Sequence, residues 1–251
     1  MTRTLTRTAA PTTSPIATAK PTAPRVDLYA PIHKALRHLM TDTLGRVGRM
    51  DVDDAGDTQD TLEQVSMLLS LCEGHLRHEN EFVHPAIDAR QPFGSKRIAD
   101  EHVEHLESIG ELRGEVHALH QARAEQRLAL ALRLYRHLAL FVAENFRHMH
   151  IEETAHNAAL WAHYSDLELL QLHQRLTASI DPREMLEVGR WMVPALNPAE
   201  RAMVLNGMKS EAPPEAFLGM LAHIRPHLDD NAWAKLTRAV GVAQSPGKAL
   251  A

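Results

Sequence analysis

Two apolar helical stripes in this chain are each interrupted by the same motif, His-x-x-x-Glu. The first stripe contains His75 and Glu79, and the second contains His148 and Glu152. The stripes cover residues 65–86 and 134–159. Apolar positions recur in them at alternating steps of three and four, the spacing of one face of an α-helix. Residues four apart share that face, so each pair is predicted to point into a core with its apolar neighbours.

Two further stripes add histidines to the same interior. His33 lies on the stripe that follows Pro31, and His102 and His105 lie on a stripe in residues 98–119. An isolated ionised carboxylate buried at low dielectric carries a Born cost of order tens of kcal/mol, so buried Glu needs compensation. A hydrogen-bonded network without metal is one solution. We favour a metal centre, because neutral imidazoles and carboxylates form a ready coordination shell.

The donor types indicate which metal this centre binds. Imidazole and carboxylate ligands without thiolate favour iron or manganese, whereas structural zinc prefers a closed tetrahedral set that includes Cys. Six ligands suit two ions better than one, with both carboxylates bridging and one position left exchangeable. The predicted ligands are His33, His75, Glu79, His102, His148 and Glu152. The role of His105 stays open between a further ligand, a partner of the bound small molecule and a core histidine.

Start and stop signals predict an all-α fold. Residues 51–60 are an acidic loop, and Gln91-Pro92-Phe93-Gly94 breaks a second helix. Such short breaks make neighbouring helices antiparallel, which describes an up-down-up-down four-helix bundle. After Ser165, Pro residues mark the starts of a series of short helices. The predicted helices span residues 31–50, 61–89, 95–121 and 124–164, followed by 166–180, 182–196, 198–209, 214–228 and 230–240.

Changes in composition and periodicity divide the chain into four parts. Residues 1–25 are rich in Thr, Pro and Ala without periodicity and are expected to form a disordered leader. The bundle is expected over residues 26–165 and a helical C-terminal extension over 166–242. Residues 243–251 are expected to be a loose tail.

Composition narrows the class of protein. The chain has 17 His, 4% aromatic residues and a formal net charge of -5, which favours imidazole chemistry and argues against a nucleic-acid partner. No apolar run approaches the roughly 20 residues that span a bilayer, so no membrane partner is expected. Because Cys72 is the single Cys, an internal disulfide is excluded. We expect it to pack in the core as a small buried side chain rather than to act as a ligand. These features predict a cytoplasmic protein.

The order of these motifs resembles the hemerythrin family, also called HHE cation-binding domains. The residues that carry the resemblance are His33, His75-x-x-x-Glu79, Glu101-His102 and His148-Met-His-Ile-Glu152, within residues 26–165. The resemblance implies a non-haem, carboxylate- or oxo-bridged centre of two iron ions. Oxygen-carrying members have a second inward His on the third helix and a terminal Asp, where this chain has Leu106 and Glu152. The four-His, two-Glu set is closer to the bacterial iron-centre repair proteins, although their Cys-pair domain is absent from this sequence.

Several other residues carry secondary expectations. Histidines off the stripes are read as peripheral, and two His pairs with metal-like spacing are read as surface residues. Two Glu are expected to accept hydrogen bonds from ligand imidazoles, and two Tyr are candidates for lining access to the centre. The off-stripe histidines are His78, His150 and His156, and the two His pairs are His117/His120 and His223/His227. The two Glu are Glu81 and Glu153, and the two Tyr are Tyr29 and Tyr135.

Two functions from different classes follow. The first is the binding or sensing of a small ligand (oxygen, nitric oxide or peroxide) at the di-iron centre. The second is an iron-dependent structural or regulatory module that signals metal or redox state to a protein partner, with docking or self-association through the C-terminal helices. Enzyme activity is left uncertain, with a peroxidase-like or nitric-oxide-related side reaction as its form.

Overall fold

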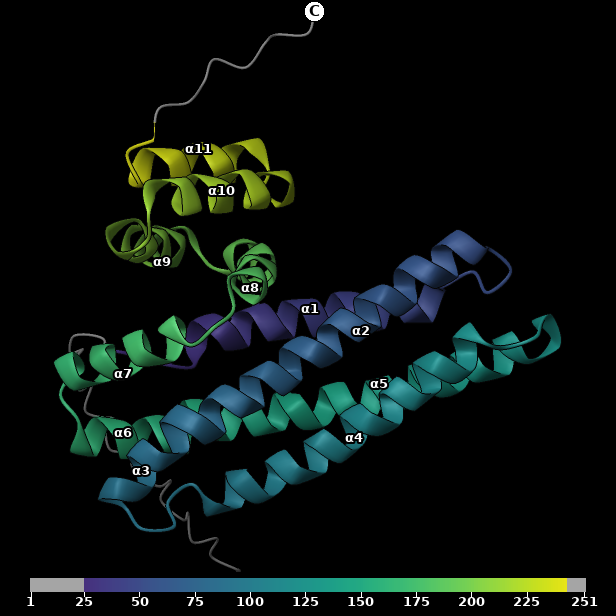
Figure 1. Ribbon diagram of the computed structural model, residues 1–251, viewed down its shortest axis with the longest axis horizontal. Coiled ribbons are helices and arrows are strands. Elements are labelled where there is room, and N and C mark those ends of the chain that lie inside the picture. Colours follow the sequence, from purple (N-terminus) through teal and green to yellow (C-terminus); the bar gives the residue numbers. More distant parts are fainter. Residues whose placement is uncertain (1–24, 243–251) are drawn as a thin grey trace, which may run out of the picture.

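A computed structural model describes residues 25–242, and every regular element within that range is helical (Figure 1). The elements are α1 (Ala30–Arg49), α2 (Ala55–His78), the π-helical turn η1 (Glu79–Val83), α3 (His84–Arg90), α4 (Lys96–His120), α5 (Ala124–Ile151), the π-helical turn η2 (Glu152–His156), α6 (Asn157–His163), α7 (Asp166–Ala178), α8 (Pro182–Ala195), α9 (Pro198–Glu211), α10 (Pro214–Ile224), the 3₁₀ turn η3 (Arg225–His227) and α11 (Asp230–Ala239). The all-α prediction is confirmed for the described residues.

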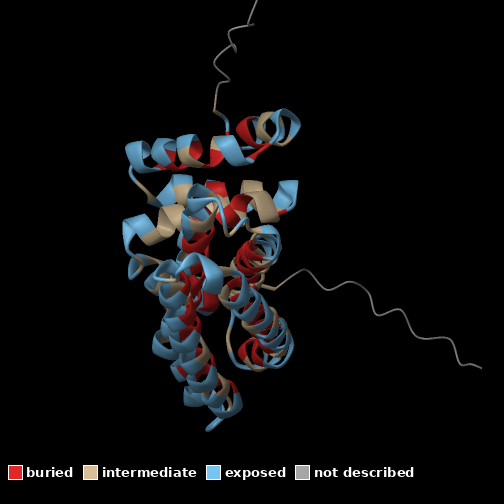
Figure 2. Cartoon of the chain, turned by 90° about the vertical axis from the view of Figure 1, so that its right-hand side faces the viewer, coloured by how far each residue is buried: buried red, intermediate tan, exposed pale blue. Residues whose placement is uncertain are grey.

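The long helices pack side by side around a shared core. α1 contacts α2, α2 contacts α4, α4 contacts α5, and α5 contacts α1. Leu39, Met40, Leu68 and Leu138 are fully buried between them. Burying one such side chain contributes about 1.5–3 kcal/mol, so this stripe-to-stripe packing dominates the stability of the core. Figure 2 shows the buried residues gathered between the packed helices, with exposed residues on their outer sides.

The second helix begins earlier than the sequence indicated. Residues 51–60 were expected to form a loop, yet α2 starts at Ala55. The side chain of Asp54 accepts hydrogen bonds from the backbone N–H groups of Gly56 and Asp57. These two N–H groups have no partner inside the helix, so the Asp54 cap fixes the start six residues before the predicted one.

Two π-helical turns interrupt the helices that bear the His-x-x-x-Glu motifs. η1 begins at Glu79 and η2 begins at Glu152, the last residue of each motif. In each turn a backbone N–H bonds the carbonyl five residues earlier, from His84 to Glu79 and from Asn157 to Glu152. A π turn therefore accommodates an extra residue and rotates the helix that follows. The continuous helices predicted for 61–89 and 124–164 are corrected accordingly.

The rotation moves each buried stripe by one residue. The predicted stripe continued through Phe82 and Ala86, whereas Val83 and Ile87 are the buried residues. After η2, burial likewise passes to His156 and Leu160 instead of the alanines that precede each of them. The helical period of the sequence therefore predicted the buried residues correctly as far as Glu79 and Glu152, but not beyond them.

The C-terminal helices form a second apolar cluster that packs on the first. α7 to α11 begin at the residues where Ser, Pro, Asp and Asn signals predicted starts. The second cluster is formed by α8 to α11 and includes Phe217, Leu221, Ile224 and Leu236, whereas Leu169 of α7 packs with Val83 and Ile87 of the bundle. α8 packs across α1, and Trp191 of α8 joins the core of the long helices (Figure 1).

The predicted leader and tail fall almost wholly outside the described residues, since residues 1–24 and 243–251 are not described. Arg25, the last residue of the predicted leader, is ordered by an ion pair with Asp166 and by hydrogen bonds to the carbonyls of Trp161 and Tyr164. Among the described helices, none is both long enough and apolar enough to cross a membrane.

Candidate metal centre

The six predicted ligands meet in the interior of the long helices. His33 comes from α1, His75 from α2, His102 from α4 and His148 from α5, while Glu79 and Glu152 begin η1 and η2. Their ligand atoms form two groups, each with all atoms within 4.8 Å of one another. The groups are His33, His75, Glu79 and Glu152, and Glu79, His102, His148 and Glu152. Both carboxylates therefore belong to both groups.

Each carboxylate faces both halves of the site. Oε1 of Glu79 lies 3.3 Å from Nε2 of His75, and its Oε2 lies 3.4 Å from Nε2 of His102. Oε2 of Glu152 lies 3.4 Å from Nε2 of His33, and its Oε1 lies 3.1 Å from Nε2 of His148. Each carboxylate thus lies between two pairs of imidazoles, an arrangement that could hold metal ions.

Three of the imidazoles are oriented by partners on their other ring nitrogen. Nδ1 of His33 lies 3.1 Å from Oε1 of Glu153, which Arg37 also binds. Nδ1 of His102 lies 2.8 Å from Oδ1 of Asn80. An acceptor on Nδ1 selects the tautomer whose Nε2 lone pair is free for a metal, and metal-ligating histidines commonly have such a partner.

The third oriented imidazole is that of His148, and its partner was not among the predicted acceptors. Nδ1 of His148 lies 3.0 Å from Oε2 of Glu101, which precedes His102 on α4. Glu153 lies at hydrogen-bond distance from the His33 imidazole, as predicted, but the same prediction for Glu81 is wrong, because that side chain is exposed. Asn80 and Glu101 fill this role instead, and helical phase gave no signal for either because both lie beside the stripes rather than on them.

The two carboxylates concentrate negative charge in the buried interior of the site. No oxygen of Glu79 or Glu152 accepts a hydrogen bond from the described residues, although all four oxygens are buried. Burial and the nearby Glu152 raise the pKa of Glu79 to about 8. Burial opposes a charge on His33, but the hydrogen bond to Glu153 and the negative charges of the nearby Glu79 and Glu152 outweigh it and raise the His33 pKa to about 9. Two buried carboxylates need protons or cations, and the surrounding imidazoles make cations the fitting choice.

His105 and Cys72 lie beside the centre without joining either group. The His105 ring is buried against Phe141 and meets the His148 ring edge-on, with centroids 4.6 Å apart, and its Nδ1 has no hydrogen-bond partner. Cys72 is buried and free, and burial raises its thiol pKa to about 12. Cys72 therefore packs as a small apolar residue, as expected.

The histidines read as peripheral divide into two classes. His150, His117 and His120 are exposed, in agreement with the prediction. The prediction is wrong for His78 and His156, which are buried. His78 lies under α8, 3.9 Å from Glu184, and the η2 turn brings His156 inward.

The second predicted surface His pair and the two Tyr residues differ in where they lie. His227 is exposed and His223 is half-buried on the C-terminal helices. Tyr29 is buried with its ring centroid 5.3 Å from that of His33. Tyr135 instead packs beside Gly48, fifteen residues from His33 along α1, or about 22 Å at 1.5 Å rise per residue. Tyr29 therefore lines the centre and Tyr135 does not.

A buried His/Glu cluster able to hold metal ions is thus the distinguishing feature of the described chain. No protein-family model and no curated protein matches the sequence.

Proposed function

We propose that residues 26–165 form a hemerythrin-like, antiparallel up-down-up-down bundle that holds two iron ions and binds or senses a small ligand. The observation that carries this proposal is the sharing of Glu79 and Glu152 between the two ligand groups. One cation would be held by His33 and His75 and the other by His102 and His148. Residues 166–242 are proposed to be a helical C-terminal extension of the bundle, and the cytoplasm is the proposed location.

The residues present fit such a centre. Four imidazoles and two carboxylates without thiolate are an iron or manganese set, and four buried oxygens without hydrogen-bond partners need the charge that two cations bring. Bound iron supplies an exchangeable coordination position for oxygen, nitric oxide or peroxide. The chain's own residues orient the imidazoles through Asn80, Glu101 and Glu153 and keep bulk water out through the buried core around Leu68 and Phe141.

A second function is supported by the contacts of the C-terminal helices with the ligand-bearing helices. Lys34, next to His33, binds Glu200 of α9. On α2, Arg77 lies 3.4 Å from Glu184 of α8. A change in the position of α1 or α2 on metal binding would therefore reach α8 and α9. An iron-dependent regulatory module that docks a protein partner, or self-associates, through these helices is the alternative proposal.

Elemental analysis tests the metal content. We expect the full chain, expressed with ample iron, to contain close to two iron atoms and little zinc. Glu79→Ala and Glu152→Ala should each lower iron content strongly, whereas His150→Ala, exposed on the same helix as His148, should leave it unchanged. About one zinc and no iron in the wild-type protein, or equal losses in all three variants, would overturn the proposal.

Ligand spectra separate the two functions. New charge-transfer bands on addition of azide or peroxide to the oxidised protein indicate an exchangeable position and support the small-ligand function. Iron-loaded protein without such bands, whose protease sensitivity in α8 and α9 changes on iron removal, supports the regulatory function instead.

A further inference from the structure

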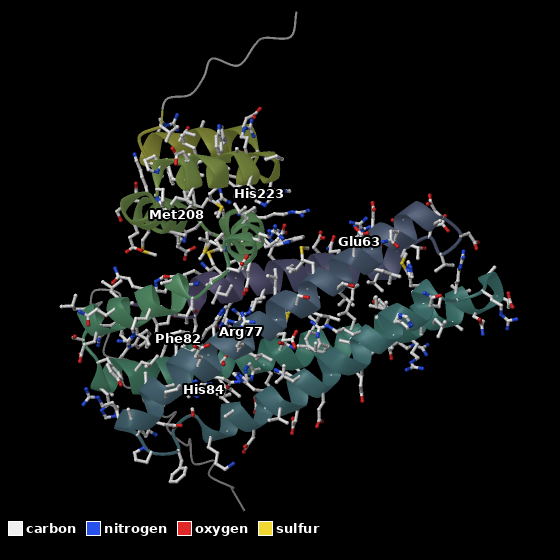
Figure 3. The ribbon with its side chains drawn as sticks, viewed as in Figure 1. Glu63, Arg77, Phe82, His84, Met208 and His223 are labelled. Carbon is white, nitrogen blue, oxygen red and sulfur yellow. The ribbon has the colours of Figure 1, made fainter. Side chains whose placement is uncertain are left out.

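Two buried histidines outside the six-residue set lie against the same centre. His84 is the first residue of α3 and His156 is the last residue of η2. Together with Glu152 they form a third group whose ligand atoms all lie within 4.8 Å of one another. All three residues are buried. Figure 3 labels His84 on the segment that continues α2 beyond Arg77, at the end of the core where α3 contacts α6.

The π-helical turns explain why these histidines point inward. In an uninterrupted α-helix, a residue five positions after Glu79 is rotated about 140° away from it, since each residue turns about 100°. The wider turn of η1 brings His84 back to the same side. His156 lies four residues after Glu152 and so stays on the same side of the helix, and after the η2 turn it is buried in place of Ala155. Each His-x-x-x-Glu motif is therefore followed by one more inward His.

The His84 ring lies on the His102 side of the centre, and the His156 ring lies next to it and to Tyr29. The His84 ring stacks on that of His102 with centroids 4.7 Å apart, and it meets the His156 ring edge-on at 5.6 Å. Nε2 of His84 is buried without a hydrogen-bond partner. A buried ring nitrogen without a partner is rare in folded proteins and calls for an explanation such as an ion.

His156 has the outer partner that a ligand histidine commonly has. The Tyr29 hydroxyl lies 3.1 Å from Nδ1 of His156, and Tyr29 is itself buried. If Nδ1 donates to the phenol oxygen, the Nε2 lone pair is left for a cation. Metal-ligating histidines are typically held in this way, and losing the outer partner weakens metal binding by about 10- to 100-fold.

We propose that His84, His156 and Glu152 form a third cation position, for a divalent first-row transition metal ion, beside the dinuclear centre. Two imidazoles and one carboxylate are a donor set used by both zinc and iron in proteins. Glu152 already faces His33 and His148, so the third ion shares that carboxylate and binds more weakly than the first two. This inference goes beyond the proposed dinuclear function, although both use Glu152.

Equilibrium dialysis of the full metal-free chain against Zn²⁺ or Co²⁺ tests the proposal. We expect two tight equivalents and a third, weaker one in the wild-type protein. His84→Gln and His156→Gln should each lose the third equivalent and keep the first two. Tyr29→Phe should weaken only the third equivalent by about 10- to 100-fold. His150→Gln, an exposed histidine near the same centre, controls for surface binding and should match the wild type.

The outcomes separate this inference from the dinuclear function. Two tight equivalents without a third in the wild type would overturn the third position and leave the dinuclear centre standing. No tight equivalents would overturn the dinuclear function itself. A third equivalent that survives in His84→Gln and His156→Gln, with unchanged far-UV circular dichroism, would place that ion elsewhere. Loss of all three equivalents in a folded His84→Gln protein would make His84 part of the dinuclear centre and would also overturn the proposal.

Discussion

Glu101 and Glu152 hold the His148 imidazole from opposite sides. Oε2 of Glu101 lies 3.0 Å from Nδ1, and Oε1 of Glu152 lies 3.1 Å from Nε2. His33 has the equivalent pair in Glu153 and Glu152 on the other half of the site. Glu101 and Glu153 thus fix the tautomers of the two imidazoles, while the shared Glu152 faces both Nε2 atoms.

Removing the outer carboxylate should weaken metal binding without removing a ligand. Glu101→Ala is expected to lower iron affinity by about 10- to 100-fold, because His148 loses the acceptor that orients it. Glu104→Ala, an exposed residue on the same helix, is the matched control and should bind iron as the wild type does. Competition with a chelator of known affinity measures the change. Equal affinities in the two variants would mean that Glu101 does not orient the ligand.

Metal removal should destabilise the fold, and the loss should grow as the pH rises from about 7 to about 9. In the metal-free protein, the folded-state pKa of Glu79 is about 8 and that of His33 about 9, above their ordinary values of 4.5 and 6.5. Both groups bind protons more tightly when folded, so their stabilising contribution is lost as the pH rises through the folded pKa values.

The metal-loaded protein should lack this loss, because cations replace the protons. Thermal unfolding of both forms at several pH values measures the difference in Tm, which should widen with pH. A tight metal ligand can stabilise the folded state by several kcal/mol through mass action. A difference that is constant across this range would show that protons on Glu79 and His33 do not substitute for metal.

Cys72 should be unreactive in the folded, metal-loaded protein. Its side chain is buried on α2, and burial raises its pKa to about 12, so almost no thiolate exists at pH near 8. We expect alkylation by iodoacetamide to be at least about 100-fold slower than in denaturant, on the ratio of thiolate at pKa values of about 12 and 8.5. Mass spectrometry follows the reaction, and rapid modification of the native protein would contradict the burial.

The sequence predicted the centre up to the last residue of each motif and then lost its register. His33, His75, His102 and His148 were placed by stripes of uninterrupted α-helix, where a fixed period is a sound guide. The π turns break that period at Glu79 and Glu152, so His84 was overlooked and His156 was taken as peripheral.

Only one of the two π turns could have been anticipated from the sequence. Pro85 lies inside the helix predicted for 61–89, and a proline without an N–H group disrupts an α-helix one turn earlier, where η1 lies. No Pro or Gly accompanies η2, so the local sequence carries no comparable signal for it. Asp54, in contrast, is an ordinary capping residue that competed with later acidic residues of the same loop.

His105 provides the last test, because it lies beside the centre but outside both ligand groups. Its ring is buried 4.6 Å from that of His148, and its Nδ1 has no partner among the described residues. His105→Ala should therefore keep most of the iron and change the affinity for azide or peroxide by about 2- to 10-fold, the equivalent of one net hydrogen bond of about 0.5–1.5 kcal/mol. His102→Ala should lose iron, since Nε2 of His102 faces both carboxylates. Iron analysis and azide titration of the two variants measure both effects. An emptied site in His105→Ala beside a full site in His102→Ala would reverse the roles of the two histidines.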